Sequence, residues 1–125
     1  MKNKIKVLVV DDDESTLDFF ERIIQEFDPE IEIYLAPNGH EGLDVFRRYT
    51  PQILFVDIAI PGFDGLELIK KIQKEDVGVK LHIWVVTGAI ISEYLISAQK
   101  AQNWDLLPKP FDAEDVEKIL AVATV

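Results

Sequence analysis

Acidic side chains follow two apolar runs of the sequence, where they can do carboxylate chemistry. Asp11, Asp12 and Asp13 come directly after the first run, and Asp57 comes directly after another. Two carboxylates about 4 Å apart repel each other by roughly 4 kcal/mol at an effective dielectric constant near 20, so three together require a cation or a proton. With no cysteine and no histidine spaced as a ligand, such a group favours Mg²⁺, with Mn²⁺ as the alternative ion, over zinc. A carboxylate is also a nucleophile that can take up a phosphoryl group.

A threonine and a lysine follow two further apolar runs. Thr87 ends one of them and Lys109 follows the other. Phosphoryl transfer requires positive charge around the transferred oxygens, which a metal and an ammonium supply, and a hydroxyl can donate a hydrogen bond to them. Taken singly, these residues have structural explanations, because acids at the start of a helix favour its dipole. Asp57 fits such an explanation poorly, since no basic residue lies near it in the sequence. The combination therefore predicts a phosphoryl site.

Short β-branched runs alternate along the chain with segments of helical periodicity. Strands are expected at residues 5–10, 31–35, 53–56, 81–86 and 106–107, and helices around 17–27, 43–46, 66–72, 91–98 and 116–123. Fully apolar strands with intervening helices predict a doubly wound α/β fold, with a parallel sheet covered on both faces. In such a sheet, ligands bind beyond the carboxyl ends of the strands. The acids, the threonine and the lysine therefore converge on one edge.

Length and composition limit the class of protein. The chain has 125 residues, 48% of them hydrophobic, which leads us to expect a single domain over 1–125 with no output domain in these residues. The net charge of −10 disfavours direct binding of nucleic acid. No apolar stretch is long enough for a membrane span or a signal peptide. We therefore expect a cytoplasmic protein that does not bind membranes.

The motifs at these strand ends resemble the receiver domain of response regulators in two-component signal transduction. The blocks that carry the likeness are VLVVDDDE, FVDIAIPGFDGLELI, VVTGA and LLPKPFD, and they span nearly the whole chain. The block from Asp57 through Pro61 to Asp64-Gly65 and the Lys-Pro-Phe at 109–111 are the most specific. The resemblance implies a flavodoxin-like sheet of five parallel strands in the order 2-1-3-4-5, with five helices on both faces.

The resemblance also assigns roles to the acids. Asp57 would be the phosphoacceptor. Asp11 and Asp12 would hold Mg²⁺ together with a carboxylate oxygen of Asp57 and the backbone carbonyl of Ala59. Asp13 is an extra acid outside this metal group.

Thr87 and Lys109 would each contact a phosphoryl oxygen, and the Lys109-Pro110 bond is cis in the family. The phosphoryl group would come from a phosphohistidine of a sensor histidine kinase or phosphotransfer protein, or from a small acyl phosphate. It would shift a two-state equilibrium at the face formed by the fourth helix, fifth strand and fifth helix, which a downstream effector or fused output domain reads. Such a domain phosphorylates itself and turns over no separate substrate, so we do not expect an enzyme.

The sequence departs from the family near its fifth strand. Leu106 stands where the family has an aromatic residue that swings inward on phosphorylation, which puts the output coupling in doubt. Gln102-Asn103 replaces a pair of small residues, and Trp104 follows, either as a partner contact or as part of the core edge. Ala59 and Ala89 have no polar side-chain atom to assist hydrolysis of the phosphoryl group.

Two other readings of the same residues remain open. A haloacid-dehalogenase-like phosphohydrolase would use Asp11 and Asp13, with Ser15 nearby, before a strand-end threonine and lysine. The chain is short for that fold, no acid pair follows Lys109, and the Asp57 block would have no role. A receiver-like interaction module that is never phosphorylated is the third reading, but such a module need not keep the full set of acids, threonine and lysine.

Overall fold

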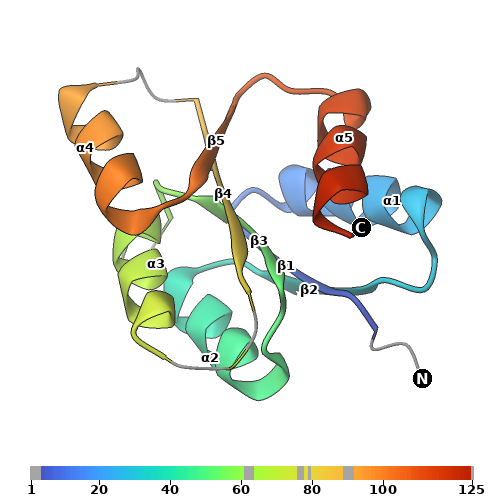
Figure 1. Cartoon of the computed structure of the whole chain (residues 1–125). Coiled ribbons are helices and arrows are strands. Elements are labelled where there is room, and N and C mark those ends of the chain that lie inside the picture. Colours follow the sequence, from blue (N-terminus) through green and yellow to red (C-terminus); the bar gives the residue numbers. More distant parts are fainter. Residues whose placement is uncertain (1–3, 61–63, 76–77, 79, 89–91, 125) are drawn as a thin grey trace.

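A parallel β-sheet lies between two layers of helices (Figure 1). The computed structural model describes residues 4–60, 64–75, 78, 80–88 and 92–124. In this part of the chain the strands are β1 (Lys6–Val10), β2 (Glu32–Ala36), β3 (Ile53–Asp57), β4 (His82–Thr87) and β5 (Asp105–Pro108). All four neighbouring pairs are parallel, and the order is β2-β1-β3-β4-β5. The predicted doubly wound, flavodoxin-like α/β fold with the order 2-1-3-4-5 is confirmed.

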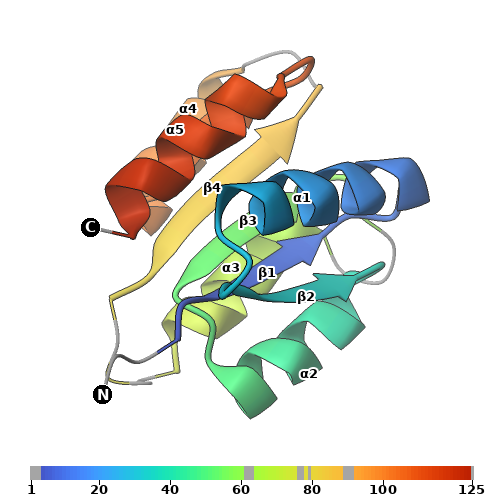
Figure 2. The same ribbon diagram turned by 90° about the vertical axis from the view of Figure 1, so that its right-hand side faces the viewer.

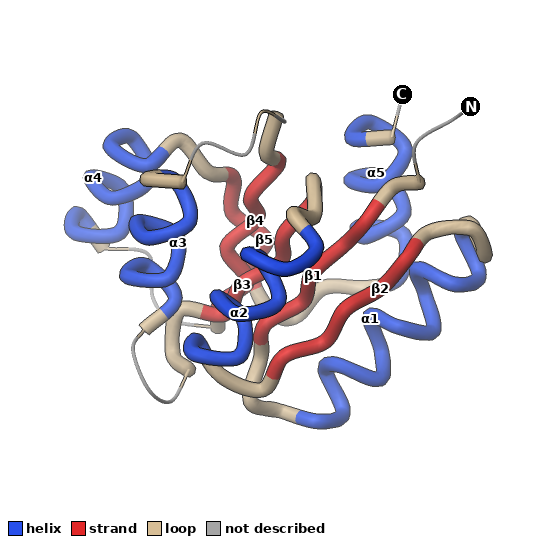
Figure 3. The backbone as a smooth tube through the Cα atoms, turned by 90° about the horizontal axis from the view of Figure 1, so that it is seen from below, coloured by secondary structure: helices blue, strands red, loops and turns tan. Residues whose placement is uncertain are grey.

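Helices cover both faces of the sheet. They are α1 (Glu14–Phe27), α2 (Gly39–Tyr49), α3 (Gly65–Gln73), α4 (Glu93–Gln102) and α5 (Ala113–Ala123). Figures 2 and 3 show α1 and α5 on one face and α2, α3 and α4 on the other. Each helix begins after a side chain that accepts a backbone hydrogen bond; the caps are Asp13, Asn38, Asp64, Ser92 and Asp112. The fourth predicted helix included Ile91, which lies outside the described residues.

The core has two parts, one on each side of the sheet. Alternate residues of a strand point to opposite faces, so Leu8 and Leu54 pack toward α2, α3 and α4, whereas Val7 and Phe55 pack toward α1 and α5. The central strands β1 and β3 are buried on both faces, which is why they read as continuous apolar runs. Among the described residues, no helix has the length and apolar character that crossing a bilayer requires.

The strand ends decide where the polar residues lie. β3 and β4 each extend one residue beyond the apolar run, so Asp57 and Thr87 are the last residues of their strands. Because β1 pairs with β3 in the middle of the sheet, Asp11 and Asp57 lie at the ends of neighbouring strands although they are 46 positions apart in the sequence. This is the point at which the winding of the sheet reverses, where ligands bind in open α/β sheets.

Candidate functional site

Asp11 is held at the end of β1 by its backbone and its side chain. Its N–H donates a hydrogen bond to the carbonyl of Ala36 at 3.0 Å, and the residue is only 2% exposed. Its Oδ1 accepts the N–H of Asp13 at 2.9 Å, and its Oδ2 lies 3.4 Å from Lys109 Nζ. One carboxylate oxygen therefore orders the turn after β1, and the other faces the lysine.

Asp57 is arranged in a similar way at the end of β3. Its Oδ1 accepts the N–H of Ala59 at 2.9 Å, and its Oδ2 accepts a hydrogen bond from Lys109 Nζ at 3.1 Å. Gly65 begins α3 directly against this strand end, and a Cβ added there would lie 2.4 Å from the carbonyl oxygen of Asp57. Only a residue without a side chain lets α3 start so close to the strand.

Lys109 is positioned by the segment between β5 and α5. Its N–H donates to the carbonyl of Thr87 at 2.8 Å, which joins this segment to the end of β4. Two residues later, the ring of Phe111 packs against Phe19 and Phe20 of α1, with centroids 5.6 and 5.3 Å away. The Lys109-Pro110 peptide bond is cis, as the resemblance implies.

Three acids form a group that fits a divalent metal ion. Asp11, Asp12 and Asp57 each offer one carboxylate oxygen, and the three oxygens lie within 4.8 Å of one another. Asp12 is exposed, whereas the other two are buried, so the group is open to solvent on one side. Carboxylates and water suit Mg²⁺ or Mn²⁺. The role of the Ala59 carbonyl as a further ligand stays a prediction.

Asp13 lies outside this metal group. Its Oδ1 accepts hydrogen bonds from the N–H and the hydroxyl of Ser15, at 3.0 and 2.7 Å. It is the N-cap of α1, and these hydrogen bonds lower the pKa of its carboxyl group. Of the three consecutive aspartates, the third therefore stabilises the helix.

The buried charges of the site perturb one another. Burial raises the pKa of Asp11, and the charge of Asp57 acts in the same direction, while the N–H of Asp13 and the ammonium of Lys109 oppose them. Burial alone would lower the pKa of Lys109, but the hydrogen bond to Asp57 and the two carboxylate charges together raise it. The lysine is therefore protonated at neutral pH, and it partly neutralises the acids.

Thr87 completes the group at the end of β4. It is 3% exposed and adjoins Lys109 through the backbone hydrogen bond described above. The structure thus brings Asp11, Asp12, Asp57 and Lys109 into direct proximity, with Thr87 on the neighbouring strand. The chemical roles assigned to these residues stay predictions, and Ala89 lies outside the described residues.

An apolar groove lies beside Lys109. It has a volume of 330 Å³; its lining residues are Ser15, Thr16, Phe19, Lys109, Pro110 and Phe111. This groove was not predicted from the sequence. One residue could have indicated it. Phe19 is aromatic, yet it does not lie on the buried face of α1, which is formed by Leu17, Phe20 and Ile24.

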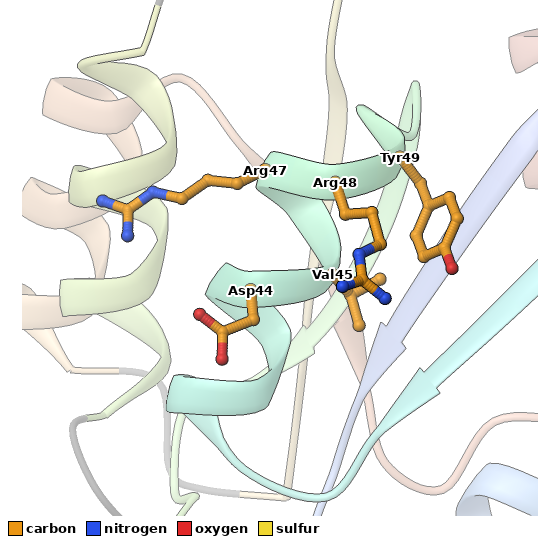
Figure 4. A pocket seen from close by; sticks show the side chains of 5 residues that line it. All are labelled: Asp44, Val45, Arg47, Arg48 and Tyr49. Carbon is orange, nitrogen blue, oxygen red and sulfur yellow. The ribbon is translucent and has the colours of Figure 1, made fainter.

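A second and larger hollow, of 580 Å³, lies on α2, and its lining residues all come from that helix. Figure 4 shows Arg47 pointing toward α3, while Arg48 and Tyr49 point the other way. Arg47 pairs with Glu75, and the ring of Tyr49 stacks on that of Tyr34 with centroids 4.2 Å apart. None of the predicted site residues lines this hollow, so we place the chemistry at the acids.

Two of the unusual residues near β5, Trp104 and Leu106, pack in the core. Trp104 is 3% exposed and packs with the residues between the sheet, α3 and α4. Of the two interpretations of Trp104 offered by the sequence, this burial supports the core edge over a partner contact. Leu106 is half-buried against the same cluster.

Known sequences resemble this chain over most of its length. A family model for the response regulator receiver domain matches residues 7–121. The chain is 33% identical over 118 residues to the transcriptional regulatory protein BtsR of Escherichia coli, covering 94% of this chain and 47% of BtsR. It is 30% identical over 111 residues to the sensory transduction protein LytT of Oceanobacillus iheyensis, covering 89% of this chain and 44% of LytT. The chain thus spans less than half the length of these two relatives.

Solved structures share the fold. A response regulator receiver domain protein from Methanospirillum hungatei matches with a TM-score of 0.85 and 27% identity, covering 98% of this chain and 95% of that protein. A signal receiver domain of a DNA-binding response regulator from Colwellia psychrerythraea matches with a TM-score of 0.86, covering 97% of this chain and 98% of that one. Its identity is 20%, so this second likeness concerns the fold alone.

Proposed function

The chain belongs to the response regulator receiver domain family, and from this we propose that it is a phosphoacceptor that takes a phosphoryl group onto Asp57. One observation carries the proposal. A buried carboxylate has one oxygen held by a backbone N–H, while its other oxygen lies 3.1 Å from an ammonium. Two further acids stand beside it. This arrangement supports Asp57 as the residue that takes the phosphoryl group.

In the proposed step, a carboxylate oxygen of Asp57 attacks the phosphorus atom of the donor. A P–O bond forms to the aspartate. The P–N bond of a phosphohistidine, or the P–O bond of a small acyl phosphate, breaks, and its electron pair leaves with the imidazole or the carboxylate. The ammonium of Lys109 is placed to balance the negative charge of the phosphoryl group. The hydroxyl of Thr87 would donate a hydrogen bond to one of the phosphoryl oxygens.

Mg²⁺ or Mn²⁺, held by Asp11, Asp12 and Asp57 with the Ala59 carbonyl, would supply positive charge at the phosphoryl oxygens. Backbone N–H groups of the chain orient the carboxylates. The hydrogen bond from Ala59 orients Asp57, and that from Asp13 orients Asp11. Both acids are therefore ordered before the donor arrives, which lowers the cost of reaching the transition state.

We infer that the donor is a sensor histidine kinase or a phosphotransfer protein. The apolar groove lined by Phe19 and Phe111 lies next to Lys109, and it supplies a docking surface within reach of the site. The protein would turn over no separate substrate, and an effector or fused output domain would read the face formed by α4, β5 and α5. A cytoplasmic location without nucleic-acid binding stays a prediction.

The haloacid-dehalogenase-like alternative requires Asp13 to face the reacting group. The carboxylate of Asp13 instead accepts two hydrogen bonds from Ser15, which speaks against that role. Phosphorylation on Asp57 and on Asp11 is also distinguishable by experiment.

The test is labelling with acetyl phosphate and Mg²⁺, followed by intact mass. We expect a gain of about 80 Da, one phosphoryl group, in the unaltered chain. Asp57→Asn should abolish the gain, whereas Asp44→Asn, at an exposed position of α2, should leave it unchanged. A label that survives Asp57→Asn and maps to Asp11 would overturn the proposal in favour of the hydrolase.

A further inference from the structure

Gln102, the last residue of α4, is hydrogen-bonded to three other parts of the chain. Its Nε2 donates to the carbonyl of Leu66, in the first turn of α3, at 3.1 Å. Its Oε1 accepts the indole N–H of Trp104 at 2.9 Å, and its backbone carbonyl accepts a hydrogen bond from the Nε2 of Gln73, at the end of α3. We call this set of Leu66, Gln73, Gln102 and Trp104 the α3–α4 clasp. It joins both ends of α3 to the end of α4.

The rest of α4 contributes little apolar contact. Leu95 is the buried residue of this helix, whereas Tyr94 is 73% exposed and Ile96 is 44% exposed. Helices in proteins are held mainly by packing of an apolar face, and α4 offers a narrow one. The clasp is therefore a large part of what fixes the last turn of α4.

The first turn of α3 rests on the phosphoacceptor strand. The N–H of Gly65 donates to the carbonyl of Ile58 at 3.1 Å. The Cα of Gly65 packs so tightly on this segment that an added Cβ would lie 2.4 Å from the carbonyl oxygen of Asp57 and 2.7 Å from the Cα of Ile58. A backbone shift at Asp57 and Ile58 must therefore move the first turn of α3, because close-packed contacts leave no slack.

These contacts form one continuous series from Asp57 to the indole. It runs from the strand end to Gly65, through the Leu66 carbonyl to Gln102, and from there to Trp104. We propose that the α3–α4 clasp makes α4 follow α3, so that a change at Asp57 reaches α4 and Trp104 through the first turn of α3. This inference rests on the proposed function, because phosphorylation of Asp57 is the change that would be transmitted. The role of the clasp in transmitting it is new.

An indole packs beside α4, although β5 itself has no aromatic residue. Trp104 directly precedes β5, and both Trp104 and Leu106 pack against the cluster between the sheet, α3 and α4. The indole N–H donates its hydrogen bond to Gln102, which makes the ring part of the clasp. Gln102 is a positioning residue that acts through α3.

The first measurement concerns the unphosphorylated protein. Gln102→Ala removes the side-chain half of the clasp, and Lys100→Ala, an exposed position of α4, is the matched control. We expect backbone amides in the last turn of α4, including the Asn103 N–H bonded to Gln99, to exchange with deuterium about 5–30-fold faster in Gln102→Ala only. Unchanged exchange would overturn the clasp.

The second measurement concerns coupling to Asp57. Trp84→Phe leaves Trp104 as the sole indole, since the chain has two tryptophans. On labelling with acetyl phosphate and Mg²⁺, we expect the Trp104 emission to change in this background. Gln102→Glu keeps the acceptor for the indole but replaces the donor to Leu66 with an oxygen, and it should reduce the change at least twofold while the phosphoryl label by intact mass stays the same.

Two outcomes separate the inference from the proposed function. An emission change of equal size in Gln102→Glu, with equal labelling, would overturn the coupling while leaving the phosphoacceptor intact. Absence of the label in the chain with Gln102 would overturn the proposed function and with it the coupling, and the exchange measurement would still decide whether the clasp holds α4.

Discussion

Replacing Asp11 with asparagine tests the electrostatics of the site directly. The carboxylate oxygens of Asp12 and Asp57 lie within 4.8 Å of that of Asp11. At an effective dielectric constant near 20, each pair repels by about 3.5 kcal/mol. The ammonium of Lys109, at 3.4 Å, attracts Asp11 by about 5 kcal/mol on the same scale. The attraction by Lys109 offsets the repulsion by Asp57, so burial, the largest cause of the raised pKa, is what makes the charge of Asp11 unfavourable.

Solvent screens the exposed Asp12, which reduces its share of the repulsion. We expect Asp11→Asn to stabilise the metal-free protein by about 1–2 kcal/mol, a rise of about 4–8 °C in the melting temperature. Asparagine keeps an acceptor for the N–H of Asp13, so the turn after β1 should survive. The measurement is thermal unfolding followed by circular dichroism, in EDTA at pH 7.

Magnesium should remove most of the advantage of Asp11→Asn. A site with a dissociation constant of about 1 mM would stabilise the unaltered protein by about 1.4 kcal/mol in about 10 mM Mg²⁺. Asp11→Asn lacks one ligand and should gain much less. Asp44→Asn, which lies on α2 away from the site, should respond to Mg²⁺ as the unaltered chain does.

The pH dependence of unfolding independently tests whether the charge of Asp11 destabilises the metal-free protein. Because the folded state raises the pKa of Asp11 above 3.8, the folded protein binds this proton more readily than the unfolded chain. Ionisation of Asp11 therefore lowers the stability of the folded protein as the pH rises through the raised pKa, and protonation restores that stability as the pH falls. The advantage of Asp11→Asn in EDTA should shrink between pH 7 and pH 4. A variant less stable than the unaltered protein at pH 7, or a melting curve indifferent to Mg²⁺, would refute the reasoning.

Three further predictions concern other residues around the site. Gly65→Ala should destabilise the fold by about 2–3 kcal/mol in urea unfolding, because the new methyl group would lie 2.4 Å from the Asp57 carbonyl oxygen; an unchanged midpoint would contradict the tight contact. Thr50→Gly should stabilise by about 1 kcal/mol, because a β-branched residue is strained at φ 46, and labelling of Asp57 should be unaffected; a loss of stability would show that the threonine side chain matters more than the strain. Lys109 has a pKa raised above 10.5, so its contribution to stability is fully present below that pH and is lost as pH rises through the folded pKa. The stability lost in Lys109→Met should therefore shrink in strongly alkaline buffer, and a difference that stays constant there would exclude a role for the charge.

Much of the fold follows from patterns that are local in the chain. Continuous apolar runs alternating with helical periodicity specify parallel strands with crossover helices, because only a sheet covered on both faces buries such strands. The rule that ligands bind beyond the carboxyl ends of the strands then directs attention to Asp57 and Lys109 before any distance is known. Strand boundaries were less predictable. β3 and β4 continue through Asp57 and Thr87, since ladder hydrogen bonds do not require an apolar side chain.

Identical residue types at neighbouring positions have different environments, and the sequence does not distinguish them. Asp12 lies with the acids that fit a metal ion, whereas Asp13 caps α1, because the two side chains point in different directions. The proximity of Lys109 to Asp11 spans 98 residues, and it depends on the packing of Phe111 against α1. Such contacts depend on how whole elements pack.

The α3–α4 clasp also combines a feature visible in the sequence with contacts that only the packing of helices decides. Gln102 and Trp104 stand out in the sequence as departures from a family pattern, which indicates that the region near β5 is unusual without saying why. That the amide of Gln102 reaches a carbonyl in α3 and the indole of Trp104 follows from the placement of α4 against α3. Residue types and their periodicity thus specify which chemistry is available and at which edge of the sheet it lies. Side-chain partners depend on the packing of segments far apart in the chain, because each contact forms only when both segments are in place.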